Sequence, residues 1–377
     1  MSAQSRVEFL QPIHDPLSRR QQLQALLQGG SGQYYLCLGG TGTSDVEGIS
    51  AAGATPGQRR LTPSIDGDIL VHGRARDQET VPVAPAGIVS PVVIVRACLN
   101  VMKWPPFVID CGTFRQPLSP YMVVGHEPAS CLSTGRALSE ESTVALFAKG
   151  MKLGSESAFK DYLLIGECVP GGTTTAAGLF EAFGLAGARH VSSSVLAPDK
   201  QLRQSLIEKG LQQAELTEQI CRQRPLAAVS AVGDPMQPFV AGLALSASAR
   251  IPVILAGGSQ MLAVFWLAKM ISQALGIKTE WADIYVITTK WVAFDRVSNT
   301  RLLSESTGAQ YFAACPDFSS SRHPALQAYE DGHVKEGLGC GALMAAAQAA
   351  QDLDNHSLMS AVDAAYEEIV LSNLVIN

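Results

Sequence analysis

The sequence predicts an α/β protein in which one parallel sheet is covered by helices on both faces, giving three layers. Apolar runs of strand length alternate with apolar segments of helix length, and glycine-rich turns separate them. Strands that are buried on both faces read as continuous apolar runs, and their alternation with helices is typical of a parallel sheet. The composition agrees, because only 16% of the 377 residues are charged, against about 25% in an average soluble protein.

The expected strands are short apolar runs, and most of them end at glycine. We expect strands at residues 34–38, 107–110, 162–165, 227–232, 253–255 and 284–288. Ligands of such sheets bind beyond the carboxyl ends of the strands. The glycine turns at those ends are therefore expected to gather along one edge of the sheet and to form the site.

The expected helices follow these turns. Ser90 and Pro91 are typical of a helix start, because proline fits the first helical position. We expect helices at residues 92–102, 176–183 and 239–246, from residue 261 onward, and at residues 341–353 and 357–370.

Residues 53–91 differ from the rest of the chain. They are rich in Pro, Gly, Asp and Arg and show little periodicity. A long irregular stretch inside a compact protein is usually functional or disordered. We expect an irregular loop here that acts as a lid or binding loop.

Charge and hydropathy exclude several classes of partner. A net charge of −6 without a basic cluster disfavours nucleic acid. Residues 251–268 are uncharged, but Pro252 and a polar glycine turn interrupt them, so a strand, a turn and a helix are expected rather than a membrane span. The first 20 residues lack the apolar core of a signal peptide, which indicates a cytoplasmic protein.

The cysteines and histidines do not form a metal motif. None of the eight cysteines forms a C-x-x-C pair, and the seven histidines form no H-x-x-x-H pair. We therefore expect neither a metal site nor a cofactor, and we interpret Cys168 as an apolar filler.

The turn at residues 166–175 is the strongest candidate for binding a phosphate. Gly171 and Gly172 allow backbone N–H groups to face a ligand, and Thr173, Thr174 and Thr175 stand at the expected start of a helix. Free N–H groups, the helix dipole and hydroxyls together suit an anion. The lysine of an ATPase loop is absent. The alternative is a tight strand-to-helix turn that the threonines cap.

Glu336 precedes a glycine turn and an alanine-rich helix. It can act as a general base whose basicity burial increases. The alternative is a plain interaction of its charge with the N-terminus of the helix.

Three further turns are expected at the same edge. Asp234, in Gly233-Asp234-Pro235, either accepts hydrogen bonds from ribose hydroxyls or caps a helix. The turn Gly257-Gly258-Ser259-Gln260 follows the strand expected at residues 253–255. Residues 39–44 lack the full G-x-G-x-x-G spacing of a dinucleotide site, so a simple turn is at least as well supported there.

The motifs occur together, in a consistent order, in one known family. They lie at residues 53–56, 61–63, 165–167, 171–176, 191–194, 232–236, 255–261 and 336–339. On these residues the chain resembles the nicotinate-nucleotide–dimethylbenzimidazole phosphoribosyltransferases of cobalamin biosynthesis, and most closely their archaeal and cyanobacterial branch, which is often left uncharacterised.

The resemblance implies a reaction and a role for each motif. The reaction moves 5-phosphoribose from nicotinate mononucleotide to a nitrogenous base and gives an α-ribotide for the lower ligand of a cobamide. Glu336 takes the role of general base, and Arg203 matches a basic residue that faces the phosphate. The residues expected to bind substrate are Glu167, Gly171, Gly172, Thr173, Thr174, Thr175, Arg203, Gly233, Asp234, Gly257, Gly258, Ser259, Gln260, Gly337 and Gly339.

The resemblance also implies an architecture. A Rossmann-like nucleotide-binding core at residues 31–330 would carry the irregular loop at residues 53–91. Residues 1–30 and 331–377 would form a smaller helical domain, and the protein would be a homodimer.

Departures from the bacterial branch leave the substrates open. Pro170 and Gly171 alter the phosphate loop, Lys335 stands where that branch has glycine, and Ala256 replaces an aspartate. Benzimidazole, adenine and a phenolic ring all stay open as acceptor, and another nucleotide stays open as donor. A non-catalytic nucleotide-binding or regulatory protein is the alternative function, and a nicotinamide-dependent oxidoreductase rests only on residues 39–43.

Overall fold

A computed structural model describes residues 10–12, 17–75, 81–84 and 87–372. In this part of the chain one sheet of eight strands forms the centre, in the order β1-β8-β7-β6-β5-β2-β3-β4. The strands are β1 Leu10–Pro12, β2 Gly32–Leu38, β3 Pro106–Asp110, β4 Met122–Val123, β5 Tyr162–Cys168, β6 Val253–Ala256, β7 Ile284–Thr289 and β8 Gln310–Ala314. Strands β2 to β8 pair in parallel, which confirms the predicted parallel sheet, and β1 adds an antiparallel edge beside β8.

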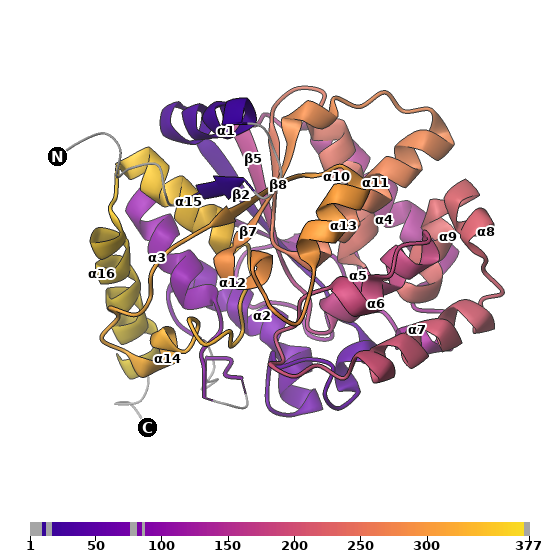
Figure 1. The fold of residues 1–377 in the computed structure, drawn as a ribbon, viewed down its shortest axis with the longest axis horizontal. Helices are drawn as coiled ribbons and strands as arrows, with labels where there is room; N and C mark the ends of the chain where they lie inside the picture. Colours follow the sequence, from indigo (N-terminus) through magenta and orange to yellow (C-terminus); the bar gives the residue numbers. More distant parts are fainter. Residues whose placement is uncertain (1–9, 13–16, 76–80, 85–86, 373–377) are drawn as a thin grey trace.

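The helices lie on both faces of the sheet (Figure 1). Their bounds are α1 Leu17–Gly29, α2 Pro56–His72, α3 Val92–Met102, α4 Glu140–Glu156, α5 Gly172–Ala182, α6 Gly187–His190, α7 Lys200–Gln213, α8 Glu218–Gln223, α9 Pro225–Val232, α10 Met236–Ala247, α11 Ser259–Leu275, α12 Lys290–Ala293, α13 Thr300–Thr307, α14 Pro324–Gln327, α15 Cys340–Gln351 and α16 Asn355–Tyr366. None of the described helices is long and apolar enough to cross a membrane.

Two hydrophobic cores flank the sheet, because successive side chains of a strand point to opposite faces. In β5, Leu163 and Ile165 belong to the core beneath α4, α5, α10 and α11. Tyr162 and Leu164 belong to the core beneath α1, α3 and α15. All four are fully buried, which explains why the strand is apolar throughout.

The expected irregular loop at residues 53–91 is wrong for its largest part, because α2 occupies Pro56–His72. Thr55 and Gln58 form a reciprocal capping box at its start. The helix packs Ile65, Ile69 and Leu70 into the core, but it buries polar side chains beside them, which obscures its apolar stripe in the sequence. Asp68 accepts hydrogen bonds from the backbone N–H groups of Leu118 and Ser119, at 2.9 and 2.7 Å.

The strand expected at residues 227–232 is also wrong, because these residues belong to helix α9. Pro225 stands at the first helical position, where proline is favoured. A short apolar run cannot by itself distinguish a buried strand from a buried helix. The turn at Gly233 therefore follows a helix and joins it to α10.

The two ends of the described chain meet on one face of the sheet. Helix α1 contacts α15, and α16 contacts α3. In Figure 1 these four helices lie together on the left of the sheet. They support, as a proposal, a smaller helical domain made from residues 1–30 and 331–377 beside a core at residues 31–330.

Candidate active site

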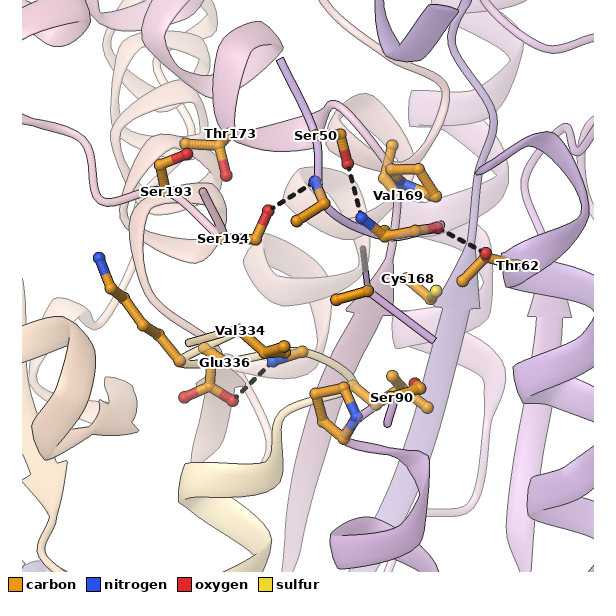
Figure 2. Close-up of a pocket in the computed structure, with 18 of the residues that line it drawn as sticks. Ser50, Thr62, Ser90, Cys168, Val169, Thr173, Ser193, Ser194, Val334 and Glu336 are labelled. Atoms are coloured by element: carbon orange, nitrogen blue, oxygen red, sulfur yellow. Dashed lines mark hydrogen bonds between the residues drawn. The ribbon is translucent and has the colours of Figure 1, made fainter. Parts of the chain in front are cut away.

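A pocket of about 910 Å³, including the space open to solvent at its mouth, lies beyond the carboxyl ends of the central strands. Five stretches of chain close around it, and Figure 2 shows their side chains. They are residues 49–52, residues 82–84 with 88, 90 and 91, residues 167–171 with 173, residues 192–194 and residues 334–338; residues 258–260, Thr62, Asp66 and Val292 also line the pocket. Its lining combines apolar side chains with a few polar groups, as is typical of a small-molecule site.

Glu336 lies in this pocket and is held by several donors. Its Oε1 accepts hydrogen bonds from the N–H groups of Gly337 and Gly341, both at 3.3 Å, and from Cys340 Sγ at 3.2 Å. Thr288 donates to Oε2 at 3.0 Å. Burial raises the pKa of Glu336, and these donors oppose the rise without cancelling it. A carboxylate that is fixed in place and made more basic suits a general base.

The backbone that presents Glu336 is strained. Val334 and Lys335 have φ values of 62° and 70°, a region that non-glycine residues rarely occupy. Lys335 N–H donates to the carbonyl of His333, and Glu336 N–H donates to that of Val334, at 2.7 and 2.9 Å. These are two successive γ-turns of the strained type. Such strain is characteristic of functional sites, where the surrounding structure has to maintain it.

Lys335 is a buried cation in the lining of the pocket. Its Nζ lies 2.9 Å from Asp295 Oδ2, and the side chains are only 4% and 7% exposed. Ser192 Oγ donates to the same oxygen at 2.9 Å. Burial favours the neutral form of Asp295, but the hydrogen bonds and the charge of Lys335 prevail and lower its pKa. The pair anchors the turn that carries Glu336.

Glu167 is the second carboxyl group from a predicted motif in the pocket. Its Oε2 accepts a hydrogen bond from the N–H of Val169 at 3.0 Å. Burial, followed by the negative charges of Asp234 and Glu336, raises the pKa of Glu167 to about 8. This carboxyl group therefore holds a proton at pH values where an exposed glutamate has lost it.

The raised pKa of Glu167 predicts how stability depends on pH. Between its ordinary value of 4.5 and about 8, the folded protein keeps a proton that the unfolded chain releases, so stability falls as the pH rises. We expect Glu167→Gln, which keeps an oxygen for Val169 N–H, to remove up to about 1.4 kcal/mol per pH unit of this slope. Urea unfolding at a series of pH values measures it. A variant with an unchanged slope would contradict the raised pKa.

Half of the predicted site residues line the pocket. They are Glu167, Gly171, Thr173, Gly258, Ser259, Gln260, Glu336 and Gly337. Gly171 has φ +83°, as a turn into α5 requires, and Thr173 follows in the first turn of that helix. The other half lies outside the lining. These residues are Gly172, Thr174, Thr175, Arg203, Gly233, Asp234, Gly257 and Gly339.

Asp234 has a geometry that fits the helix-cap interpretation. Its Oδ1 accepts from the N–H groups of Met236 and Gln237, at 3.1 and 3.3 Å, at the start of α10. Thr175 Oγ1 donates to its other oxygen at 2.5 Å. Burial raises the pKa of Asp234 to about 6 against these hydrogen bonds. Asp234 and Thr175 thus form hydrogen bonds within the protein, outside the pocket lining.

Arg203 lies on α7, away from the pocket lining. It is buried, its guanidinium donates to the carbonyl of Ala188 at 3.3 Å, and burial lowers its pKa to about 10. Lys335 is the basic side chain that the structure brings to the pocket. The sequence marked Lys335 only as a departure from the bacterial pattern.

The turn at residues 39–43 lies outside the pocket as well. Its N–H groups bond within the protein, since Gly40 donates to the carbonyl of Gly112 at 2.9 Å and Gly42 to that of Ala129 at 2.8 Å. They therefore do not face a ligand. This geometry supports a simple turn rather than a dinucleotide site.

Several polar residues of the pocket were not predicted as site residues. They are Ser50, Thr62, Asp66, Ser90, Ser192, Ser193 and Ser194. In Figure 2, Thr173, Ser193 and Ser194 stand on one side of the pocket, and Ser90 and Cys168 stand on the other. The motifs at residues 61–63 and 191–194 were the available signal for Thr62 and the serines, whereas Asp66 fell in the segment expected to be irregular.

Known proteins resemble this chain in sequence. A family model described as phosphoribosyltransferase matches residues 101–277. A UPF0284 protein of Gloeobacter violaceus is 43% identical over 339 residues, which cover 89% of this chain and 88% of that protein. A UPF0284 protein of Microcystis aeruginosa is 38% identical over 333 residues, covering 88% and 91%.

Solved structures share the fold. The crystal structure of CobT from Thermus thermophilus covers 97% of this chain and 94% of its own, with a TM-score of 0.60 and 17% identity. That of the nicotinate-nucleotide–dimethylbenzimidazole phosphoribosyltransferase from Thermus thermophilus has a TM-score of 0.59 at 17% identity and covers 100% and 97%. The solved structures confirm the predicted fold, and the sequence matches confirm the predicted family: the chain belongs to the UPF0284 proteins, and its residues 101–277 match the phosphoribosyltransferase family model.

Proposed function

We propose that this phosphoribosyltransferase moves 5-phosphoribose from nicotinate mononucleotide to a nitrogenous base and so makes an α-ribotide for a cobamide. The observation that supports this most is Glu336, a half-buried carboxylate with a raised pKa, which four hydrogen-bond donors hold in the pocket. The donor specificity and the cobamide role rest on the resemblance of the motifs and on the name of the structural neighbour.

In the proposed step a ring nitrogen of the acceptor attacks the anomeric carbon of the ribose. The bond from that carbon to the pyridinium nitrogen breaks, and its electron pair stays on that nitrogen, so nicotinate leaves with a neutral ring. Glu336 takes the N–H proton that the acceptor loses when it becomes a neutral azole. Because the leaving nitrogen is already cationic, the departing group needs no acid.

The phosphate would bind on the side of the pocket that is rich in hydroxyls. Ser193 Oγ accepts from the N–H of Val195 and Ser194 Oγ from that of Ala51, both at 3.2 Å. Each hydroxyl can then turn its own proton toward an anion. Thr173 and the start of α5 face the same space, and an N-terminal helix end favours negative charge.

The test is product formation. We expect the purified protein, supplied with nicotinate mononucleotide and a panel of azole and purine bases, to release nicotinate and to form one new ribotide, both detected by mass spectrometry. Tight nucleotide binding without nicotinate release from any base would contradict the transferase. It would favour a non-catalytic nucleotide-binding protein on the same scaffold.

We also propose a cytoplasmic homodimer, as the family resemblance implies. Light scattering of the purified full chain should give twice the mass of 39.9 kDa. A mass equal to that of one chain would contradict the dimer.

A further inference from the structure

The pocket holds a carboxyl group that the proposed reaction does not use. Asp66, on α2, is 1% exposed and lines the pocket. Its Oδ2 accepts hydrogen bonds from Ser90 Oγ at 2.9 Å and from Cys168 Sγ at 3.5 Å. Its Oδ1 is buried and has no hydrogen-bond partner among the described residues.

An unpaired buried carboxyl oxygen is costly for a protein to maintain. Nearly all buried polar atoms have a partner, and one without a partner keeps the full cost of its desolvation. Burial raises the pKa of Asp66 to about 7, and the two donors at Oδ2 only moderate the rise. The two donors hold the carboxyl group in position through Oδ2, and Oδ1 is left unpaired. Such a group is suited to accept a hydrogen bond from a ligand.

Asp66 stands on the side of the pocket opposite the proposed phosphate site. Its partners Ser90 and Cys168 lie across the pocket from Thr173 and Ser193 in Figure 2. Apolar side chains of Ile88, Pro91 and Leu338 line the pocket as well. Apolar walls around one unpaired polar group match a flat aromatic ring that carries one polar substituent.

Asp66 and Glu336 also act on a common neighbour. The buried phenol of Tyr329 has a raised pKa because of burial and the charges of Cys340, Asp66 and Glu336. Both carboxyl groups also line the same pocket. One acceptor ring that reaches Glu336 with its nitrogen would turn its far edge toward Asp66.

We propose that Asp66 determines which acceptor base is used, with Oδ1 accepting a hydrogen bond from an N–H or O–H group on the ring edge remote from the attacking nitrogen. The natural acceptor then carries an amine or hydroxyl substituent there, and a base that bears only methyl groups is disfavoured. This inference rests on the proposed function, because it names the class of acceptor for the same site.

The test uses two ligands that differ in one donor, 5-aminobenzimidazole and 5-methylbenzimidazole. Their dissociation constants are measured by calorimetry, with and without nicotinate mononucleotide. The pH is kept above the pKa of Asp66, so that its carboxyl group is ionised. We expect the wild type to bind the amine about 10-fold or more tightly than the methyl compound, as is usual for a hydrogen bond to a charged group.

Asp66→Asn is the decisive variant. Its amide oxygen can keep the bonds from Ser90 and Cys168, and its NH₂ then meets the ligand's amine with donor against donor. The variant should bind the two ligands about equally tightly, because the hydrogen bond that favours the amine is gone. Asp66→Ala should give the same ratio, which guards against an altered Asn orientation. Asp68→Asn, a buried change on the same helix and outside the pocket lining, should keep the wild-type ratio.

The outcomes separate this inference from the proposed function. Equal binding of the two ligands by the wild type, the same ratio in Asp66→Asn, or no binding of either ligand would overturn the role of Asp66. A ratio that depends on Asp66 while no base is ever ribosylated would instead overturn the transferase reaction and leave the recognition of a donor-bearing ring in place.

Discussion

Glu336→Gln is expected to lower kcat by about 10²- to 10⁴-fold, the range that a positioned general base contributes. Glutamine cannot take the proton that the acceptor loses on attack, so the new bond would have to form before the proton leaves. Nucleotide binding should change little, because the proposed phosphate site lies among other residues. Single-turnover rates and nucleotide dissociation constants measure the two effects separately.

The surroundings of Glu336 allow this substitution without misfolding. The glutamine oxygen can take the place of Oε1 and accept from Gly337, Gly341 and Cys340. Its amide nitrogen can donate to Thr288 Oγ1, because a hydroxyl both donates and accepts. Loss of activity in a variant with a wild-type melting temperature then reports on chemistry.

The pH profile provides an independent readout for Glu336. Since burial raises the pKa of this carboxyl group, the wild-type rate should climb with pH through a range above that of an exposed glutamate. The rate of Glu336→Gln should not show this rise with pH. Glu305→Gln, in an exposed ion pair with Arg301, serves as the control and should leave rate and profile unchanged. A Glu336→Gln variant with wild-type turnover would remove Glu336 from the base role.

The regular parts of the fold were predictable because burial leaves a record in the sequence. Strand β5 is apolar over Tyr162 to Ile165 because neighbours cover both of its faces. Helix α2 left a weaker record, since its buried face mixes Ile65 and Ile69 with polar residues, namely Ser64, Asp66 and Asp68. These residues bind other loops or line the pocket, so local pattern and tertiary role conflict there, as is common at functional sites.

The site was predictable only where glycine marks it. Gly171 takes the positive φ that the turn into α5 requires, and Glu336 with Gly337 precedes the positive φ of Gly339. The choice between Arg203 and Lys335 as the pocket cation could not be made from the sequence. It depends on the positive φ of Lys335 and on Asp295, 40 residues away, and neither is a local property.

Breaking the pair between Lys335 and Asp295 is expected to lower the free energy of unfolding by about 3–5 kcal/mol, because the partner that remains is a buried charge without compensation. Lys335→Met and Asp295→Asn each test this by urea unfolding. The exposed pair of Arg301 and Glu305, with side chains 63% and 41% exposed, should cost no more than about 1 kcal/mol when Glu305→Gln breaks it.

The double variant Lys335→Met/Asp295→Asn and the pH dependence identify the cause of the loss. Removing both charges should recover part of the stability, since neither charge is then left unpaired. The folded pKa of Asp295 is lowered, so its contribution is complete above its unfolded pKa and disappears as the pH falls through the folded value. The difference between wild type and Asp295→Asn should therefore shrink in acid. Single variants as stable as the wild type would mean that the pair does not hold the strained turn. In that case Glu336 would need another anchor.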